Sequence, residues 1–155
     1  MPTFYSDQGY GLGFAGLATS ILLVSSAVGS FIGASLSDRV SRLMIASFSL
    51  FMIAPLSFLL LNAEGILPIV VLSILLGLML NANWPILLMI GQEVFPGGAG
   101  ASSGLAFGWG FVANALGSFI AGFLADAIGL REALELLALL PVIGAGLIFL
   151  MPSGR

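Results

Sequence analysis

Charged residues divide the chain into five long uncharged stretches. These stretches are residues 8–37, 43–63, 65–92, 94–125 and 136–154. A helix of roughly 20 apolar residues crosses the ~30 Å hydrocarbon core of a bilayer, and each stretch is long enough for one such helix. The apolar residues run continuously and do not alternate with polar ones, which argues against transmembrane strands. The pattern predicts an all-α membrane protein with about five transmembrane helices.

Turn signals between the stretches place the ends of the predicted helices. The charged turn 37–42 separates the first helix from the second, and Asn62–Gly65 ends the second with a glycine suited to a left-handed C-terminus. Pro96–Gly98 and Gly129–Glu132 mark the later boundaries. The predicted spans, all within one domain over residues 1–155, are about 11–36, 43–62, 66–91, 100–128 and 133–151.

Composition supports the membrane assignment and excludes most chemistry. The chain is 59% apolar and 7% charged, whereas an ordinary globular domain is about 25% charged. It contains no Cys and no His, so zinc, haem, thiol and Ser–His sites cannot form. We therefore expect no enzymatic activity, no metal and no cofactor, and the four basic residues predict no nucleic-acid partner.

Two enzyme-like motifs are rejected. The GxGxxG pattern at Gly11–Gly16 lacks the preceding strand that a dinucleotide site needs, and the GxSxG pattern at Gly100–Gly104 lacks the base that a serine nucleophile needs.

Basic residues predict the orientation, because short loops rich in Lys and Arg stay in the cytoplasm. Arg39 and Arg42 place the first turn inside. Alternation from there places Glu64 outside, Glu93 inside and Arg131 outside. We expect a multi-pass protein of the cell (inner) membrane, with the N-terminus of this chain outside and its C-terminus cytoplasmic.

Small residues recur four positions apart in the first and fourth predicted helices, a spacing that lets two helices approach closely in lipid. The glycines in these registers are Gly29, Gly33, Gly100, Gly104, Gly108 and Gly117. We expect these two helices to be inner or tightly packed ones. The simpler interpretation is that glycine is common in membrane helices.

Two segments share the pattern small-x-Leu-small-Asp-x-x-small. They are residues 34–41, with Asp38, and residues 122–129, with Asp126, so the two aspartates lie 88 positions apart (126 − 38). That distance accommodates about three helices with their loops. The two copies end on opposite sides of the predicted membrane, as in the inverted three-helix repeats of secondary transporters.

The stretch GASLSDRVSR at 33–42 resembles the signature Gly-x-Leu-Ala-Asp-Arg-x-Gly-Arg-Lys of the major facilitator superfamily. Ala34, Ser41 and Leu43 depart from it. The segment GQEVFPGGAGASSGLAFGWGF at 91–111 resembles more narrowly the fosmidomycin-resistance type of efflux protein. The resemblance implies the last five of twelve helices, a partial six-helix half of the fold. The N-terminal transporter half would then be a missing partner, and residues 1–5 would be the tail of the preceding helix.

The resemblance also implies a role for the charged turn. In the motif of Asp38, Arg39 and Arg42, the aspartate would cap or pair with neighbouring helices in one conformation and release them in the other, which helps to time alternating access. The alternative is a solvated turn that only fixes topology. Glu93 is either a charge partner in the same layer or, as we expect, a solvated helix end.

Polar groups at mid-helix depth are the candidate substrate contacts, because they are costly in a bilayer. Asn81, Asn83 and Trp84 lie near the middle of the third predicted helix. Pro85 removes a backbone hydrogen bond there and bends the helix. Asn114 lies near the middle of the fourth. These residues predict one wall of a cavity for an amphiphilic small molecule. The alternative is hydrogen bonding between helices, worth about 0.6 kcal/mol on average.

By this resemblance we expect part of a secondary transporter that exports a small drug or metabolite in exchange for protons. Five helices alone are not expected to transport, because alternating access needs two halves around a central site. Mid-helix depth holds no Asp, Glu, Lys or His, so the proton-coupling residue is expected outside this chain. The alternative function is a small non-transporting scaffold or assembly subunit in the bilayer.

Overall fold

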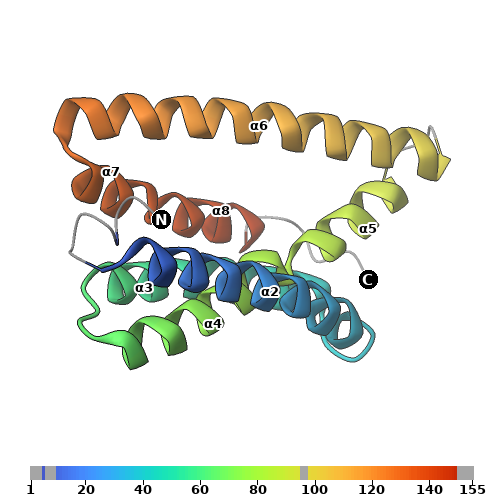
Figure 1. Cartoon of the computed structure of the whole chain (residues 1–155). Helices are drawn as coiled ribbons and strands as arrows, with labels where there is room; N and C mark the ends of the chain where they lie inside the picture. The colour runs from blue at the N-terminus through green and yellow to red at the C-terminus, as the bar shows by residue number, and fades with distance from the viewer. Residues whose placement is uncertain (1–4, 6–9, 95–97, 150–155) are drawn as a thin grey trace.

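The structure is a computed structural model that describes residues 5, 10–94 and 98–149, and these residues are almost entirely helical (Figure 1). The helices are α2 (Leu12–Ser37), α3 (Arg42–Leu61), α4 (Ile66–Ala82), α5 (Trp84–Val94), α6 (Gly98–Ile128), α7 (Leu130–Leu137) and α8 (Leu140–Phe149). Four segments of the described chain are long and apolar enough to cross a membrane: Leu12–Ser37, Arg42–Leu61, Ile66–Glu93 and Gly100–Ile128. The predicted all-α membrane fold is confirmed.

The third predicted span is broken close to its middle. α4 ends at Ala82 with Asn83 as its C-cap, and α5 begins at Trp84. Pro85 has no N–H to donate to the carbonyl of Asn81, so the regular helical ladder stops there. Figure 1 shows α5 turning away from the line of α4 and toward α6. The expected bend at Pro85 is therefore a change of direction between two helices.

The segment expected as a single helix over residues 133–151 contains two helices instead. α7 ends at Leu137 and α8 begins at Leu140. Pro141 cannot donate to the carbonyl of Leu137, and its ring crowds that carbonyl, so a continuous helix is disfavoured. At 1.5 Å per residue the 8-residue α7 and the 10-residue α8 are about 12 and 15 Å long, so neither alone crosses a hydrocarbon core of ~30 Å. Residues 150 and 151 of the predicted span lie outside the described residues, as do residues 1–4 and Arg155.

α2 and α4 form the closest helix pair. Cβ atoms added at Gly29 and Gly33 would lie 2.2 Å from the Leu78 carbonyl oxygen and 2.1 Å from the Ala82 carbonyl oxygen, respectively. The two backbones approach this closely only because those positions of α2 carry no side chain. Gly77 of α4 faces α2 in the same way.

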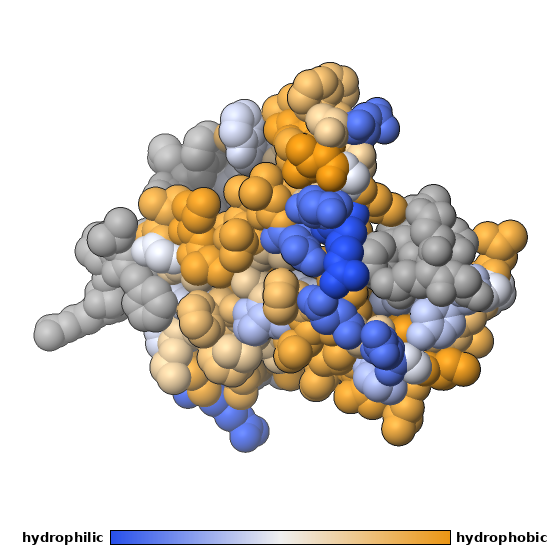
Figure 2. Space-filling model, turned by 90° about the vertical axis from the view of Figure 1, so that its left-hand side faces the viewer, coloured by the Kyte–Doolittle hydropathy of each residue, from blue (hydrophilic) through white to orange (hydrophobic). Residues whose placement is uncertain are grey.

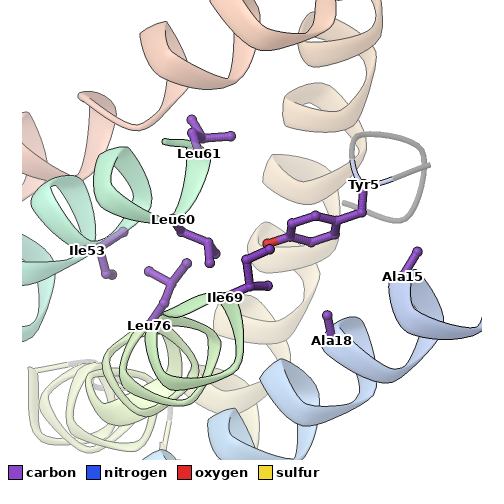
Figure 3. Close-up of a cluster of buried hydrophobic side chains, with 8 residues drawn as sticks. All are labelled: Tyr5, Ala15, Ala18, Ile53, Leu60, Leu61, Ile69 and Leu76. Atoms are coloured by element: carbon purple, nitrogen blue, oxygen red, sulfur yellow. The ribbon is translucent and has the colours of Figure 1, made fainter. Parts of the chain in front are cut away.

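Large and small side chains from three helices fill the core beside this pair. Figure 3 shows Tyr5 pointing toward Ile69 of α4, with Leu60 of α3 on the far side and Ala18 of α2 nearby. The tyrosine is 2% exposed and its ring lies 6.3 Å from the ring of Tyr10. The side chain of Tyr5 is thereby packed against α2, α3 and α4.

α6 stands apart from this core. It contacts chiefly α5 and α7, and none of its most apolar window is buried. Figure 1 shows it running antiparallel to α2 along one side of the molecule, with α7 and α8 between α6 and α3. Asp38 follows the end of α2, and Asp126 lies in the last turn of α6 at the opposite end of the molecule.

Candidate substrate pocket and charged ends

A pocket of about 320 Å³ lies where α4, α5 and α6 meet. The described residues that line it are Asn81, Trp84, Phe107, Gly110, Phe111 and Asn114. Asn81 lies near the middle of the 28-residue segment Ile66–Glu93, and Asn114 lies in the middle of the 31-residue α6. The two asparagines of the pocket therefore lie near the middle of two segments long enough to cross a membrane, roughly 20 residues or fewer from either end at 1.5 Å per residue.

The two amides of the pocket engage different neighbours. Asn81 Nδ2 donates to Ser26 Oγ at 3.3 Å, which ties the pocket to α2. Asn114 Oδ1 accepts a hydrogen bond from Ser118 Oγ at 3.4 Å, one turn along α6. One amide thus uses its nitrogen, and the other uses its oxygen.

Aromatic rings form the apolar part of the wall. The centroids of the Trp84 and Phe107 rings lie 5.8 Å apart, and the ring planes are inclined by 58°. Gly110 lies directly beside the indole, because a Cβ at that position would be 2.9 Å from Trp84 Cη2. The glycine makes room for the indole between α5 and α6.

Asn83, the fourth candidate from the sequence, does not line this pocket. It is 8% exposed and caps α4 at the break. Two residues apart on a helix means about 200° of rotation, so Asn81 and Asn83 point to different sides. The aromatic residues Phe107 and Phe111 were not singled out by sequence reasoning. Phe107 lies seven residues and Phe111 three residues before Asn114, which places all three on one face of α6. This spacing is the sequence pattern that could have identified the two phenylalanines.

One charged end of the molecule contains the turn after α2. Arg42 Nη1 at the start of α3 lies 2.6 Å from Glu93 Oε1 at the end of α5. Glu93 at this helix end is therefore both solvated, as the sequence suggested, and paired with Arg42. The side chains are 33% and 62% exposed, so water screens the pair. Asp38 and Arg39 are exposed in the neighbouring turn.

The other end gathers polar groups from four elements. Arg131 of α7 donates to Asn62 Oδ1 after α3 and, through Nε, to Glu135 Oε1 at 3.1 Å. The backbone N–H of Gly65 donates to the Tyr10 hydroxyl at 3.0 Å. Figure 2 shows hydrophilic side chains gathered at this end among hydrophobic ones. A pocket of about 460 Å³ opens here, lined by Tyr10, Leu61, Asn62, Ala63, Glu64 and Arg131.

The four glycines of α6 that were expected to pack closely bring no other described helix near them. A Cβ added at Gly100, Gly104, Gly108 or Gly117 would meet no atom within 4 Å. These four residues lie on a helix whose apolar window is fully unburied. Close packing at these glycines stays a prediction. The helix that would pack on them lies outside the described part of the chain.

The family model described as Major Facilitator Superfamily matches residues 1–154. The chain is 36% identical over 155 residues to YfnC of Bacillus subtilis (strain 168), named as an uncharacterized MFS-type transporter. It is 32% identical over 159 residues to the fosmidomycin resistance protein of Escherichia coli (strain K12). Each alignment covers 99% of this chain, but only 37% and 38% of the two relatives. No solved structure matches the chain. The resemblance expected from the sequence motifs is confirmed.

Proposed function

The chain belongs to the Major Facilitator Superfamily, and we propose that it forms the C-terminal part of a secondary active transporter that exports a small organic compound. In this proposal the pocket between α4, α5 and α6 is the chain's share of the substrate site. The observation that carries the proposal is the convergence of two amides and an indole at mid-membrane depth. The volume of about 320 Å³ falls within the range of small-molecule sites, roughly 300–1,000 Å³. The N-terminal half of the transporter would complete the walls.

The break between α4 and α5 supports a moving site. α4 packs mainly on α2, whereas α5 packs mainly on α6. The break at Asn83 therefore joins a helix that packs on α2 to a helix that contacts α6 as well as α2 and α3, and the pocket lies where α4, α5 and α6 meet. Broken helices near the midplane are a recurrent feature of transporters, where one bundle rocks against another. A small rotation at the break would change the distance between Asn81 and Asn114.

The charged contacts at the two ends support alternating access. The pair of Arg42 and Glu93 joins the start of α3 to the end of α5 at one end. Arg131 and Asn62 join α7 to the turn after α3 at the other end. An exposed ion pair contributes about 0–1 kcal/mol, so it can open and close readily as the transporter changes state. Asp38 would act beside this first contact.

The proposal also covers the coupling ion and the orientation of the chain in the membrane. Residues 65–92 and 94–125 contain no charged residue, so a proton-carrying group would come from outside this chain. The positive-inside rule places the end with Arg39 and Arg42 in the cytoplasm of an inner-membrane protein, with the N-terminus of the chain outside. Proton exchange for the exported compound is the proposed mode of coupling.

Proton movement in proteoliposomes loaded with a pH-sensitive dye tests this function. One preparation contains the 155-residue chain alone, and another contains the chain joined to the N-terminal part of the E. coli fosmidomycin resistance protein. That whole protein, assayed with fosmidomycin, is the reference. We expect a panel of small uncharged aromatic compounds to drive proton movement with the joined protein and not with the chain alone. Concentrative transport by the chain alone would overturn the need for a second half. An inactive joined protein beside an active reference would favour the scaffold alternative.

A further inference from the structure

We infer that the pocket between α4, α5 and α6 selects an uncharged compound that carries a flat aromatic ring and one amide-like group. This inference rests on the proposed function, because it names the class of substrate for the same site. Three features of the described lining carry it: the aromatic wall, the complementary state of the two amides, and the lack of charge.

The aromatic wall suits a flat ring. Trp84 and Phe107 are inclined to each other with centroids 5.8 Å apart, and Phe111 follows one turn after Phe107. The indole of Trp84 lies against the backbone of α6 at Gly110, where no side chain intervenes. An aromatic ligand can then stack on one ring and contact the edge of another, the two arrangements that aromatic pairs prefer.

The two amides offer one acceptor and one donor. Asn81 donates one of its two N–H groups to Ser26, and its carbonyl oxygen is left to accept from a ligand N–H. The oxygen of Asn114 accepts from Ser118, and the N–H groups of its amide are left to donate to a ligand carbonyl. A primary amide or a lactam carries both an N–H and a C=O, so it can form a hydrogen bond with either asparagine.

Charge is excluded by what surrounds the pocket. None of its described lining residues is charged, and the stretches 65–92 and 94–125 that supply them contain no charged residue at all. An anion or a cation at this depth would lose its hydration without gaining a partner from these helices. An uncharged ligand loses much less, so the wall that this chain supplies favours an uncharged compound.

Fluorescence of Trp84 measures this selectivity directly. The chain has two tryptophans, and Trp109→Phe leaves Trp84 alone; Trp109 is 76% exposed and lies outside the pocket. The chain is placed in phosphatidylcholine nanodiscs and titrated with 4-bromobenzamide, whose bromine quenches indole fluorescence, or with the isosteric anion 4-bromobenzoate. We expect saturable quenching by the amide and no saturable quenching by the anion. Asn114→Leu should weaken amide binding about five- to tenfold, and Asn114→Gln should recover part of it.

The variant Trp84→Phe is the control for simple partitioning into lipid, because Trp109 then reports any probe dissolved in the bilayer. Its quenching should rise linearly without saturation. Saturable binding of the benzoate, alone or equal to that of the amide, would overturn the charge selectivity and leave the pocket as a ligand site. Quenching that is linear for both probes would overturn this inference, while the proton-movement assay would decide the proposed function separately.

Discussion

Replacing Gly33 by alanine perturbs the closest approach between two helices. The added Cβ would lie 2.1 Å from the carbonyl oxygen of Ala82, whereas ordinary contact begins at 3.4 Å. Because this oxygen belongs to the backbone of α4, it cannot rotate away as a side chain could. α2 and α4 must therefore separate locally by about 1.3 Å, the difference between those two distances. A gap of 0.5–1 Å already forfeits roughly a quarter to a half of the dispersion energy of each atom pair.

The expected loss of stability follows from that separation. Overpacking a well-fitted interface costs about 1–3 kcal/mol. Alanine favours the helix over glycine by roughly 0.5–1 kcal/mol, which works in the opposite direction. We therefore expect Gly33→Ala to lower the free energy of unfolding by about 1–2 kcal/mol. Gly16→Ala is the matched control on α2, because a Cβ there meets no atom within 4 Å. That variant should be neutral or slightly stabilising.

Reversible unfolding in mixed detergent micelles, followed by far-ultraviolet circular dichroism as the fraction of dodecyl sulfate is raised, measures both variants. The midpoint should fall for Gly33→Ala and stay or rise for Gly16→Ala. Equal midpoints for the two variants would refute the packing of α2 on α4.

Three further changes have defined expectations. Glu93→Gln removes the exposed ion pair with Arg42 and should change the free energy of unfolding by less than about 1 kcal/mol in the same detergent titration. Gly110→Leu should displace the indole of Trp84 and weaken 4-bromobenzamide binding roughly two- to tenfold in the quenching assay, since an aromatic contact contributes about 0.5–1.5 kcal/mol. Pro141→Ala restores a backbone donor between α7 and α8, so the helical circular dichroism signal should increase; an unchanged signal would mean that another contact causes the break.

Helix positions were readable from the sequence wherever a continuous apolar run met a polar turn. α2 and α3 begin and end within one residue of the predicted bounds 11–36 and 43–62. The two breaks were less accessible, because a proline near a helix middle can bend a helix, end it or be tolerated. Pro55 lies inside α3, whereas the helices stop just before Pro85 and Pro141. The difference depends on tertiary packing that a local pattern does not contain.

The pocket was partly predictable for a similar reason. Depth in the bilayer singled out Asn81, Trp84 and Asn114, and the structure brings these three together. Depth alone could not separate Asn83, which lies about 200° around the helix from Asn81 and points to a different side. Contacts such as that between Arg131 and Asn62 join residues 69 positions apart and follow only from the placement of whole helices.

The access of water to Asn114 tests the central claim most directly. The chain contains no cysteine, so Asn114→Cys introduces a unique thiol into it. The joined protein carrying this change is made cysteine-free elsewhere and placed in membrane vesicles of either orientation, and a membrane-impermeant maleimide is added outside. Leu116→Cys, on the opposite face of α6, is the control. We predict labelling of position 114 in both orientations and none at position 116. Position 114 unlabelled from both sides, as for a thiol buried between helices or in lipid, would contradict the account.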